Sequence, residues 1–256
     1  MILCIDVGNT HIHGGVFKEQ NLILQFRKTT RPTSSSDEIG LFLKGVLNEN
    51  KISKEKITNI SLCSVVPGSI YSIRSACIKY FGINPFQLKS GKKTGLKIKY
   101  HNPQDVGADR IANAMAGIDL FPRKNIVIID FGTATTFCVI SKEKEYYGGI
   151  ILPGLKISME ALENKTAKLK SVEIMPCNYV VGKTTTESIQ SGLYWGHIGM
   201  IKEIKTQIAN ENFQGKMPFT IGTGGFSNLF DNTKLLNTTV PDLALRGLCK
   251  ALILNS

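Results

Sequence analysis

The stretch Ile2-Leu3-Cys4-Ile5-Asp6-Val7-Gly8-Asn9-Thr10 opens the chain, and it returns half a chain later as Ile126-Val127-Ile128-Ile129-Asp130-Phe131-Gly132-Thr133-Ala134-Thr135. In both copies an aliphatic run typical of a buried strand ends in an aspartate, one apolar residue and a glycine. Burying a bare carboxylate costs free energy, so each aspartate is expected at the end of its strand, facing a polar cleft. The glycine permits a tight turn and a close approach to the backbone.

The segments that follow the two stretches are also alike. Apolar runs at residues 11–17 and 22–26 flank a polar break, and so do runs at 136–140 and 146–151. Strand, turn and strand in this order predict a β-meander in each half. The repeat predicts an α/β protein with two similar lobes, residues 1–121 and 122–256, whose Asp-x-Gly turns face each other. Turns rich in Gly, Thr and Asn donate hydrogen bonds to phosphate, and carboxylates hold its counter-cation, so the arrangement suits a nucleotide.

A third motif, Gly107-Ala108-Asp109-Arg110, leads into an expected helix at residues 111–120. An aspartate in a first helical turn is ordinarily favoured by the helix dipole, which is a purely structural explanation for Asp109. Arginine is unfavourable at the same end, so Arg110 needs another reason, such as an anionic ligand. A guanidinium beside a carboxylate can bind a substrate carboxylate while the aspartate accepts a hydroxyl proton.

Four ordered blocks together carry a resemblance to a known family. The blocks are Asp6-Val7-Gly8-Asn9-Thr10, Gly107-Ala108-Asp109-Arg110, Asp130-Phe131-Gly132-Thr133-Ala134 and Gly148-Gly149-Ile150-Ile151-Leu152-Pro153-Gly154. In their order and in their distribution along the chain, these blocks resemble the motifs of the type III pantothenate kinases. That family belongs to the acetate and sugar kinase, Hsp70 and actin superfamily. The resemblance implies two actin-like ATPase (ribonuclease H-like) lobes, each a mixed sheet with flanking helices. It also implies an ATP-dependent transferase that phosphorylates pantothenate to 4'-phosphopantothenate, the first step of coenzyme A biosynthesis.

The resemblance implies a role for individual residues. Asp109 resembles the catalytic base, and Asp6 and Asp130 resemble the residues that orient Mg²⁺ and hold a monovalent cation, K⁺ or NH₄⁺. The nucleotide-binding positions that it implies are Asp6, Val7, Gly8, Asn9, Thr10, His11 and Thr133. The pantothenate-binding positions that it implies are Tyr100, Gly107, Ala108, Asp109, Arg110 and Thr185. From the sequence alone, a half-exposed packing role for Tyr100 is about as good an explanation as a substrate contact.

The segment Gly182-Lys183-Thr184 looks like a phosphate loop of the Gly-x-x-x-x-Gly-Lys-[Ser/Thr] type. The position of its leading glycine is Cys177, and Pro176 and Asn178 interrupt any preceding strand, so such a loop is rejected. Threonine stands at residue 184 where the family usually has asparagine, and Thr185 has an N-cap as its structural explanation.

A helix is expected from Ser188 to about residue 209, and it contains Gly192, Gly196 and Gly199. Each glycine costs about 1 kcal/mol relative to alanine, which close packing against another helix would offset. The family forms homodimers, so the resemblance implies a homodimer here.

Composition narrows the class of protein. Among 256 residues, 42% are apolar, and 31 Lys and Arg against 20 Asp and Glu give a net charge of +11. The charge favours anionic partners such as ATP or a carboxylate. Nucleic-acid binding is disfavoured, because no basic cluster is interleaved with aromatic residues. No signal peptide or membrane span is expected, and six scattered cysteines without a Cys-x-x-Cys pair indicate reduced thiols in the cytoplasm.

Two alternatives stay open on these grounds. One is a kinase of the same superfamily that phosphorylates another small acceptor. The other is an ATP-binding transcription accessory protein, a description given to some relatives and compatible with the charge of +11.

Overall fold

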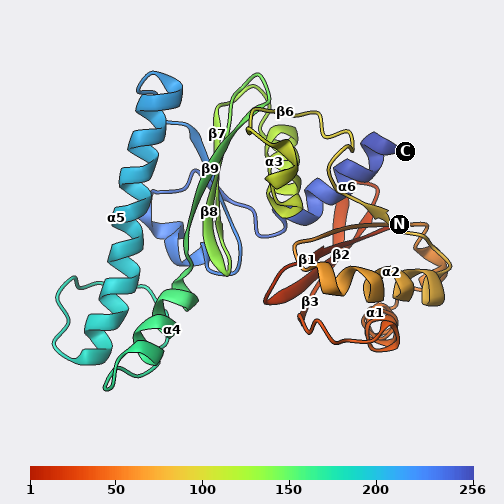
Figure 1. The fold of residues 1–256 in the computed structure, drawn as a ribbon, viewed down its shortest axis with the longest axis horizontal. Coiled ribbons are helices and arrows are strands. Elements are labelled where there is room, and N and C mark those ends of the chain that lie inside the picture. The colour runs from red at the N-terminus through yellow and green to blue at the C-terminus, as the bar shows by residue number, and fades with distance from the viewer. The chain divides into compact units, whose positions relative to one another are not determined.

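The computed structural model describes residues 1–256, which form two compact units, each built around its own sheet (Figure 1). The first unit contains Met1–Leu96, Tyr100–Ala116 and Leu243–Ser256, and the second contains Lys97–Lys99 and Gly117–Asp242. The last helix, α6 (Leu243–Asn255), is therefore part of the first unit. The lobe boundary between residues 121 and 122 stays a prediction. None of the helices combines the length and apolar character that crossing a bilayer requires.

The first unit contains a five-stranded sheet in the order β3-β2-β1-β4-β5. Its strands are β1 (Ile2–Val7), β2 (His11–Lys18), β3 (Asn21–Thr29), β4 (Asn59–Ser64) and β5 (Phe86–Gln87). The antiparallel run β1-β2-β3 confirms the predicted meander, and β4 joins parallel to β1. β4 covers only part of the largely apolar stretch at residues 57–66, because the 3-10 helix η1 (Lys54–Lys56) precedes it and Pro67 begins a helix.

The two faces of this sheet have different partners. Leu3, Ile5 and Val7 share a core with residues of α1 (Ser36–Glu49) and α2 (Pro67–Phe81). Side chains alternate along a strand, so Cys4 and Asp6 lie on the opposite face. Helix α6 covers that face, where the Ser61 hydroxyl donates a 2.8 Å hydrogen bond to the Leu248 carbonyl. The face that carries Asp6 is therefore partly closed by a helix from the far end of the chain.

Two helix ends show ordinary capping chemistry. The sequence Ser35-x-x-Glu38 has the pattern of a capping box, and the box is present: Glu38 N donates to Ser35 Oγ at 3.1 Å, and Ser35 N donates to Glu38 Oε2 at 2.7 Å. Gly82 ends α2 in the left-handed conformation at φ +69°, as expected for a glycine C-cap.

The second unit contains a six-stranded sheet in the order β11-β10-β7-β8-β9-β6. Its strands are β6 (Lys97–Ile98), β7 (Ile126–Phe131), β8 (Ala134–Ile140), β9 (Glu145–Pro153), β10 (Phe219–Thr223) and β11 (Thr238–Thr239). β7, β8 and β9 form an antiparallel meander, and β10 pairs parallel with β7 as β4 does with β1. The predicted internal duplication is thus present in the strand topology.

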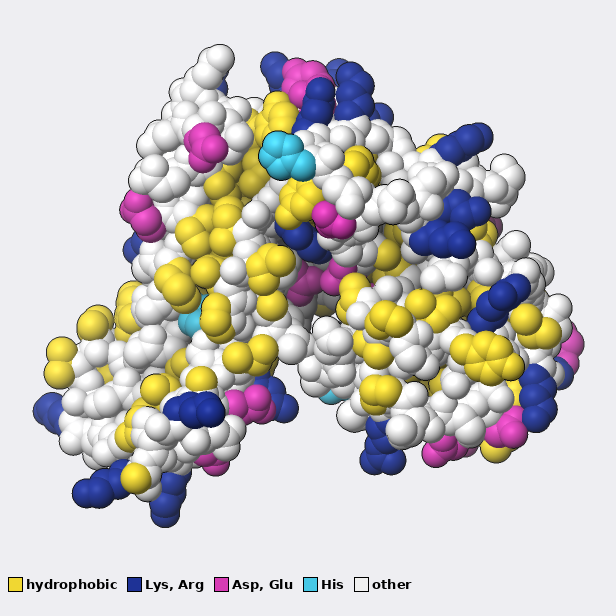
Figure 2. All heavy atoms as spheres, viewed as in Figure 1, with side chains coloured by type: hydrophobic (Ala, Val, Ile, Leu, Met, Phe, Trp, Pro, Cys, Tyr) yellow, Lys and Arg dark blue, Asp and Glu magenta, His cyan; other side chains and the backbone are white.

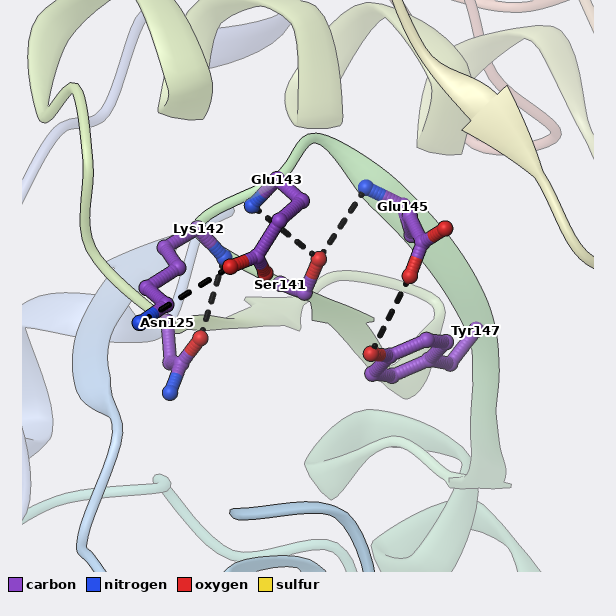
Figure 3. A network of polar contacts seen from close by, with 6 residues as sticks. All are labelled: Asn125, Ser141, Lys142, Glu143, Glu145 and Tyr147. Carbon is purple, nitrogen blue, oxygen red and sulfur yellow. Dashed lines mark hydrogen bonds and ion pairs between the residues drawn. The ribbon is translucent and has the colours of Figure 1, made fainter.

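The turn between β8 and β9 is held by a small polar network (Figure 3). The buried Ser141 hydroxyl accepts hydrogen bonds from Glu143 N at 3.2 Å and Glu145 N at 3.3 Å. Asn125, just before β7, accepts from Lys142 N at 2.9 Å, which ties the turn to the start of the unit's first meander strand. The network therefore holds the β8-β9 turn, which lies at the opposite end of the strands from the Asp130 turn.

Helices of the second unit include α4 (Leu155–Lys165) and α5 (Thr185–Phe213). α5 is longer than the predicted range of 188–209, because Thr184 caps it and Glu187 completes a capping box. The N-cap is therefore Thr184, and Thr185 is the first helical residue. No strand precedes Gly182-Lys183-Thr184, because residues 166–184 form a loop, so the strand, loop and helix order of a phosphate loop is absent there.

Candidate active site

The first Asp-x-Gly turn joins β1 to β2 and is held by short hydrogen bonds. Gly8 N donates to the His11 carbonyl at 3.0 Å, and Thr30 binds both sides of the turn. The Thr30 hydroxyl donates to Gly8 O at 2.7 Å, and Thr30 N donates to Thr10 O at 2.9 Å. Asn9 and His11 are exposed, while Val7 points into the core, so Val7 can offer a ligand only its backbone.

Asp6 lies on the α6 face of the sheet, in register with Cys63 on β4 and His13 on β2. The Cys63 thiol donates a 3.1 Å hydrogen bond to Asp6 Oδ1. On the other side, burial and the nearby Arg27 guanidinium lower the pKa of His13 to about 4, so this ring is neutral at pH 7. Asp6 thus stands between two neutral side chains on its neighbouring strands.

The Gly107-Ala108-Asp109-Arg110 motif forms the start of α3 (Ala108–Leu120). Asp109 Oδ1 accepts a 2.8 Å hydrogen bond from Arg110 N. A Cβ at position 107 would come within 2.5 Å of Asp109 Oδ1, so only glycine allows this carboxylate position. Arg110 itself is 7% exposed. Asp109 is half-buried, so the motif presents a partly accessible carboxylate next to a buried arginine.

The environment of Asp109 shifts its proton affinity. Burial raises the pKa of the Asp109 carboxyl, and the Arg110 amide and guanidinium oppose that shift without cancelling it. A carboxylate made more basic in this way is suited to accepting a proton from a hydroxyl group. Burial also raises the pKa of the Cys63 thiol well above its usual range, and the Asp6 and Asp109 carboxylates raise it further. The two motif carboxylates of the first unit, Asp6 and Asp109, therefore both lie near this one thiol.

The predicted pantothenate-binding residues fall into two groups. Tyr100, Gly107, Ala108 and Arg110 lie within one segment of the first unit, Tyr100–Ala116, and Tyr100 is half-buried. Within that segment, Asn102 caps the 3-10 helix η2 (Pro103–Asp105) by accepting from Gln104 N at 3.2 Å. Thr185 is exposed in the first turn of α5, in the second unit. The first group is thus organised by a single short segment, and Thr185 is not part of it.

The second Asp-x-Gly turn is crowded by glycines. Gly224 has φ +88°, and a Cβ there would lie 2.4 Å from Asp130 Oδ1 and 2.7 Å from the Phe131 backbone. A Cβ on Gly132 would lie 3.3 Å from the same oxygen. Glycine at these positions lets backbone pack directly against the carboxylate.

The same turn brings carbonyl oxygens together. A Cβ on Gly154, just after β9, would lie 2.3 Å from Thr133 O and 2.6 Å from Gly132 O. Carboxylate and carbonyl oxygens are the ligands that K⁺ and Mg²⁺ accept in proteins, so the donor chemistry fits a cation at Asp130. Thr133 shares this turn, and its main chain is close to Gly154.

Two features of the site were not predicted. The sequence identifies Cys63 only as one of six reduced thiols, because the pairing of β4 with β1 that places it beside Asp6 is a long-range contact. From the sequence, the Thr223-Gly224-Gly225 turn could equally pass beneath an adenine or be an ordinary strand-to-helix turn, and neither interpretation predicts that Gly224 packs against Asp130. The Gly-Gly pair at residues 224 and 225 indicates that some group packs closely against the backbone, but the sequence does not show which residue this is.

Solved structures with this architecture define the class. A Campylobacter jejuni protein described as a Baf family transcriptional activator matches with a TM-score of 0.62 and 18% identity, covering 98% of this chain and 97% of that one. A Sinorhizobium meliloti protein described as a 2-dehydro-3-deoxygalactonokinase matches with a TM-score of 0.58 and 13% identity, covering 98% and 96%. The two meander-containing sheets and these neighbours place the chain among proteins with the actin-like ATPase and sugar kinase fold.

Sequence comparison then gives the family. The model of the type III pantothenate kinase family matches residues 2–207. A type III pantothenate kinase from Legionella pneumophila (strain Paris) is 56% identical over 256 residues, which is 100% of each chain. The chain belongs to the type III pantothenate kinase family, and it is an ATP-dependent kinase.

Proposed function

We propose that this protein transfers the γ-phosphoryl group of ATP to the primary hydroxyl of pantothenate. The products are ADP and 4'-phosphopantothenate, and the reaction is the first step of coenzyme A biosynthesis. The observation that carries the mechanism is the half-buried Asp109 carboxylate, with its raised pKa, in the same unit as the Asp6 turn. The reaction takes place in the cytoplasm.

In the proposed mechanism the two Asp-x-Gly turns handle the nucleotide. Asp6 orients the Mg²⁺ that accompanies ATP, and the Asn9-Thr10 turn and Thr133 donate hydrogen bonds to phosphate oxygens. Asp130 would hold K⁺ or NH₄⁺ through its carboxylate. When bound, these cations neutralise charge on the phosphates, which is the main requirement of phosphoryl transfer.

Asp109 and its neighbours handle the acceptor. The Arg110 guanidinium, Tyr100, the Gly107-Ala108 backbone and Thr185 hold pantothenate with its hydroxyl directed at Asp109. Asp109 accepts the hydroxyl proton as the oxygen forms its bond to the γ-phosphorus, and the bond to the β-phosphate oxygen breaks to release ADP. The raised pKa of Asp109 favours this proton transfer, because the carboxylate gains proton affinity when it is removed from water.

The direct test is ADP release from ATP and Mg²⁺, measured with and without pantothenate, and with K⁺ or Na⁺ as the only monovalent cation. Turnover that requires pantothenate and is faster in K⁺ is the expected result. A folded protein that binds ATP but shows no pantothenate-dependent ADP release in either salt would exclude pantothenate as the acceptor.

We also propose that the chain forms a homodimer through the outer face of α5. A Cβ added at Gly192, Gly196 or Gly199 would meet no atom within 4 Å beyond the helix itself. Exposed apolar side chains accompany these glycines on α5 and the preceding loop, namely Met175, Tyr179, Val180, Val181 and Met200. Figure 2 shows hydrophobic side chains over the region of α4 and the lower part of α5. Glycines within a helix cost about 1 kcal/mol each, which close approach of a second copy of α5 would offset.

The variant Gly196→Ala tests this interface, because it should stabilise an exposed helix but weaken a packed dimer. If the face is exposed to water, the substitution raises the free energy of unfolding by about 0.8–1 kcal/mol, the ordinary helix-propensity gain. If a second copy packs there, the added methyl group separates the helices, and the dimer dissociates at higher protein concentration than the wild type. We expect the second result in sedimentation velocity measurements across a concentration series. A monomeric wild type, or a stabilised and unchanged dimer, contradicts the proposal.

Gly45→Ala on α1, which also has no neighbour within 4 Å, is the matched control, and it should only add stability.

A further inference from the structure

Cys63 occupies an unusual place for a cysteine outside the family motifs. Its side chain is 0% exposed, and its thiol donates to Asp6 Oδ1 at 3.1 Å. A thiol is ordinarily a weak donor that behaves as a small apolar group in a core. Here it faces a carboxylate at the end of the strand that forms the nucleotide turn.

The sheet geometry makes this contact a built feature of the fold. Asp6 and Cys63 are register partners on parallel neighbouring strands, so their side chains leave the sheet on the same face. The parallel β1-β4 pairing is continuous on both sides of them, from Ile2 with Asn59 to Val7 with Ser64. Helix α6 covers the same face one row away, at Cys4 and Ser61, which limits movement of the thiol.

A neutral donor has a specific advantage beside this carboxylate. A lysine or arginine at residue 63 would bind Asp6 more strongly, but it would neutralise the charge that a phosphate-bound cation needs. The thiol directs one carboxylate oxygen and leaves the negative charge in place.

We propose that Cys63 is a positioning residue for nucleotide binding: its thiol holds Asp6 Oδ1 and so fixes the direction of Asp6 Oδ2. The inference rests on the proposed function only in assigning Asp6 to the nucleotide. Cys63 contacts neither substrate in this role, so removing its thiol should affect the nucleotide and leave pantothenate binding unchanged.

The test compares three variants of the full chain. Cys63→Ala removes the donor, Cys63→Ser replaces it with a hydroxyl donor, and Cys77→Ala is the matched control. Cys77 is also 0% exposed, but it lies in α2 within the core on the opposite face of the sheet. Binding of a non-hydrolysable ATP analogue with Mg²⁺ is measured by calorimetry without pantothenate, and KM values are measured separately for MgATP and pantothenate.

We expect Cys63→Ala to weaken analogue binding by about three- to tenfold, the range for loss of one ordinary hydrogen bond, because a thiol is a weak donor. The KM for MgATP should rise with it and the KM for pantothenate should not. Cys63→Ser should restore binding, and Cys77→Ala should lower only the melting temperature. The proposal is wrong if Cys63→Ala binds the analogue as tightly as the wild type and only loses stability, as Cys77→Ala does. Cys63 would then be a packing residue.

Raman spectroscopy of the S–H stretching band gives a readout that depends neither on turnover nor on whether the Cys63→Ala variant folds. The wild-type minus Cys63→Ser difference isolates the Cys63 band, which should lie at the low frequency of a thiol bound to a carboxylate. Asp6→Asn should move it to higher frequency, because an amide oxygen is a weaker acceptor. A band that does not respond to Asp6→Asn overturns the proposal. If the wild type binds the analogue but does not use pantothenate, the acceptor is wrong and the Cys63 result still decides this inference.

Discussion

Asp109→Asn is expected to lower turnover by about 10²–10⁴-fold, the usual contribution of a general base. The amide keeps the size and the hydrogen bond from Arg110 N but cannot accept the hydroxyl proton. Binding of the ATP analogue and of pantothenate should change little, because the change acts on the proton transfer. The measurement is steady-state ADP release at saturating substrates, accompanied by calorimetry for binding.

The same substitution should stabilise the fold at neutral pH. Burial raises the folded-state pKa of Asp109 above its unfolded value, so the folded protein disfavours the charged form. The stability associated with this group is complete below the unfolded pKa and is lost as pH rises through the folded pKa. Asparagine does not ionise, so Asp109→Asn should unfold at higher temperature than the wild type at pH 7, with the difference vanishing in acid.

Asp105→Asn is the matched control for both effects. Asp105 is an exposed carboxylate in η2, hydrogen-bonded to Asn102 Nδ2 at 2.8 Å, and it lies only four residues from Asp109. The turnover of Asp105→Asn should stay within about twofold of the wild-type value, as expected for a surface substitution. Near-normal turnover by a correctly folded Asp109→Asn enzyme would remove Asp109 from the role of base.

Gly224→Ala is expected to damage both the stability and the cation response of the second unit. The positive φ costs roughly 1–2 kcal/mol for a residue with a Cβ. The overlap with Asp130 Oδ1 at 2.4 Å and the Phe131 backbone at 2.7 Å adds about 1–3 kcal/mol of overpacking. At about 2–4 °C per kcal/mol for a chain of this size, the melting temperature should fall by roughly 4–20 °C.

The functional effect of Gly224→Ala follows from displacement of Asp130. Turnover should fall by about 10²-fold, comparable to the loss of one electrostatic group in an active site. The K⁺ over Na⁺ advantage should disappear, because the carboxylate can no longer occupy its position beside the turn. The assay is ADP release in each salt at a temperature where the variant is folded.

Gly215→Ala separates backbone strain from crowding. Gly215 has φ +78°, and its nearest neighbour, Asn210 Oδ1, would lie 3.8 Å from the added Cβ. It should cost only the roughly 1–2 kcal/mol of the positive φ, with an unchanged cation response. If Gly215→Ala and Gly224→Ala behave alike, contact with Asp130 is not what makes Gly224 necessary.

Local features of the fold were predictable from sequence because they depend on neighbouring residues. The capping box at Ser35 and Glu38, the C-cap at Gly82 and both meanders occur where their residue patterns place them. The shorter β4 and the longer α5 differ from expectation, because element ends depend on caps and neighbours that a periodic pattern does not contain.

The amino-acid sequence by itself determined the family, the internal duplication, and the two aspartates that end β1 and β7, because ordered motifs and apolar runs are local properties of the chain. The tertiary structure alone decided which groups surround those aspartates. Cys63 reaches Asp6 only because β4 pairs parallel with β1, and Gly224 reaches Asp130 only because β10 pairs parallel with β7. Both contacts join residues far apart in the chain, 57 positions in the first case. The burial that raises the pKa of Asp109 likewise depends on packing of the whole unit, which no stretch of sequence contains.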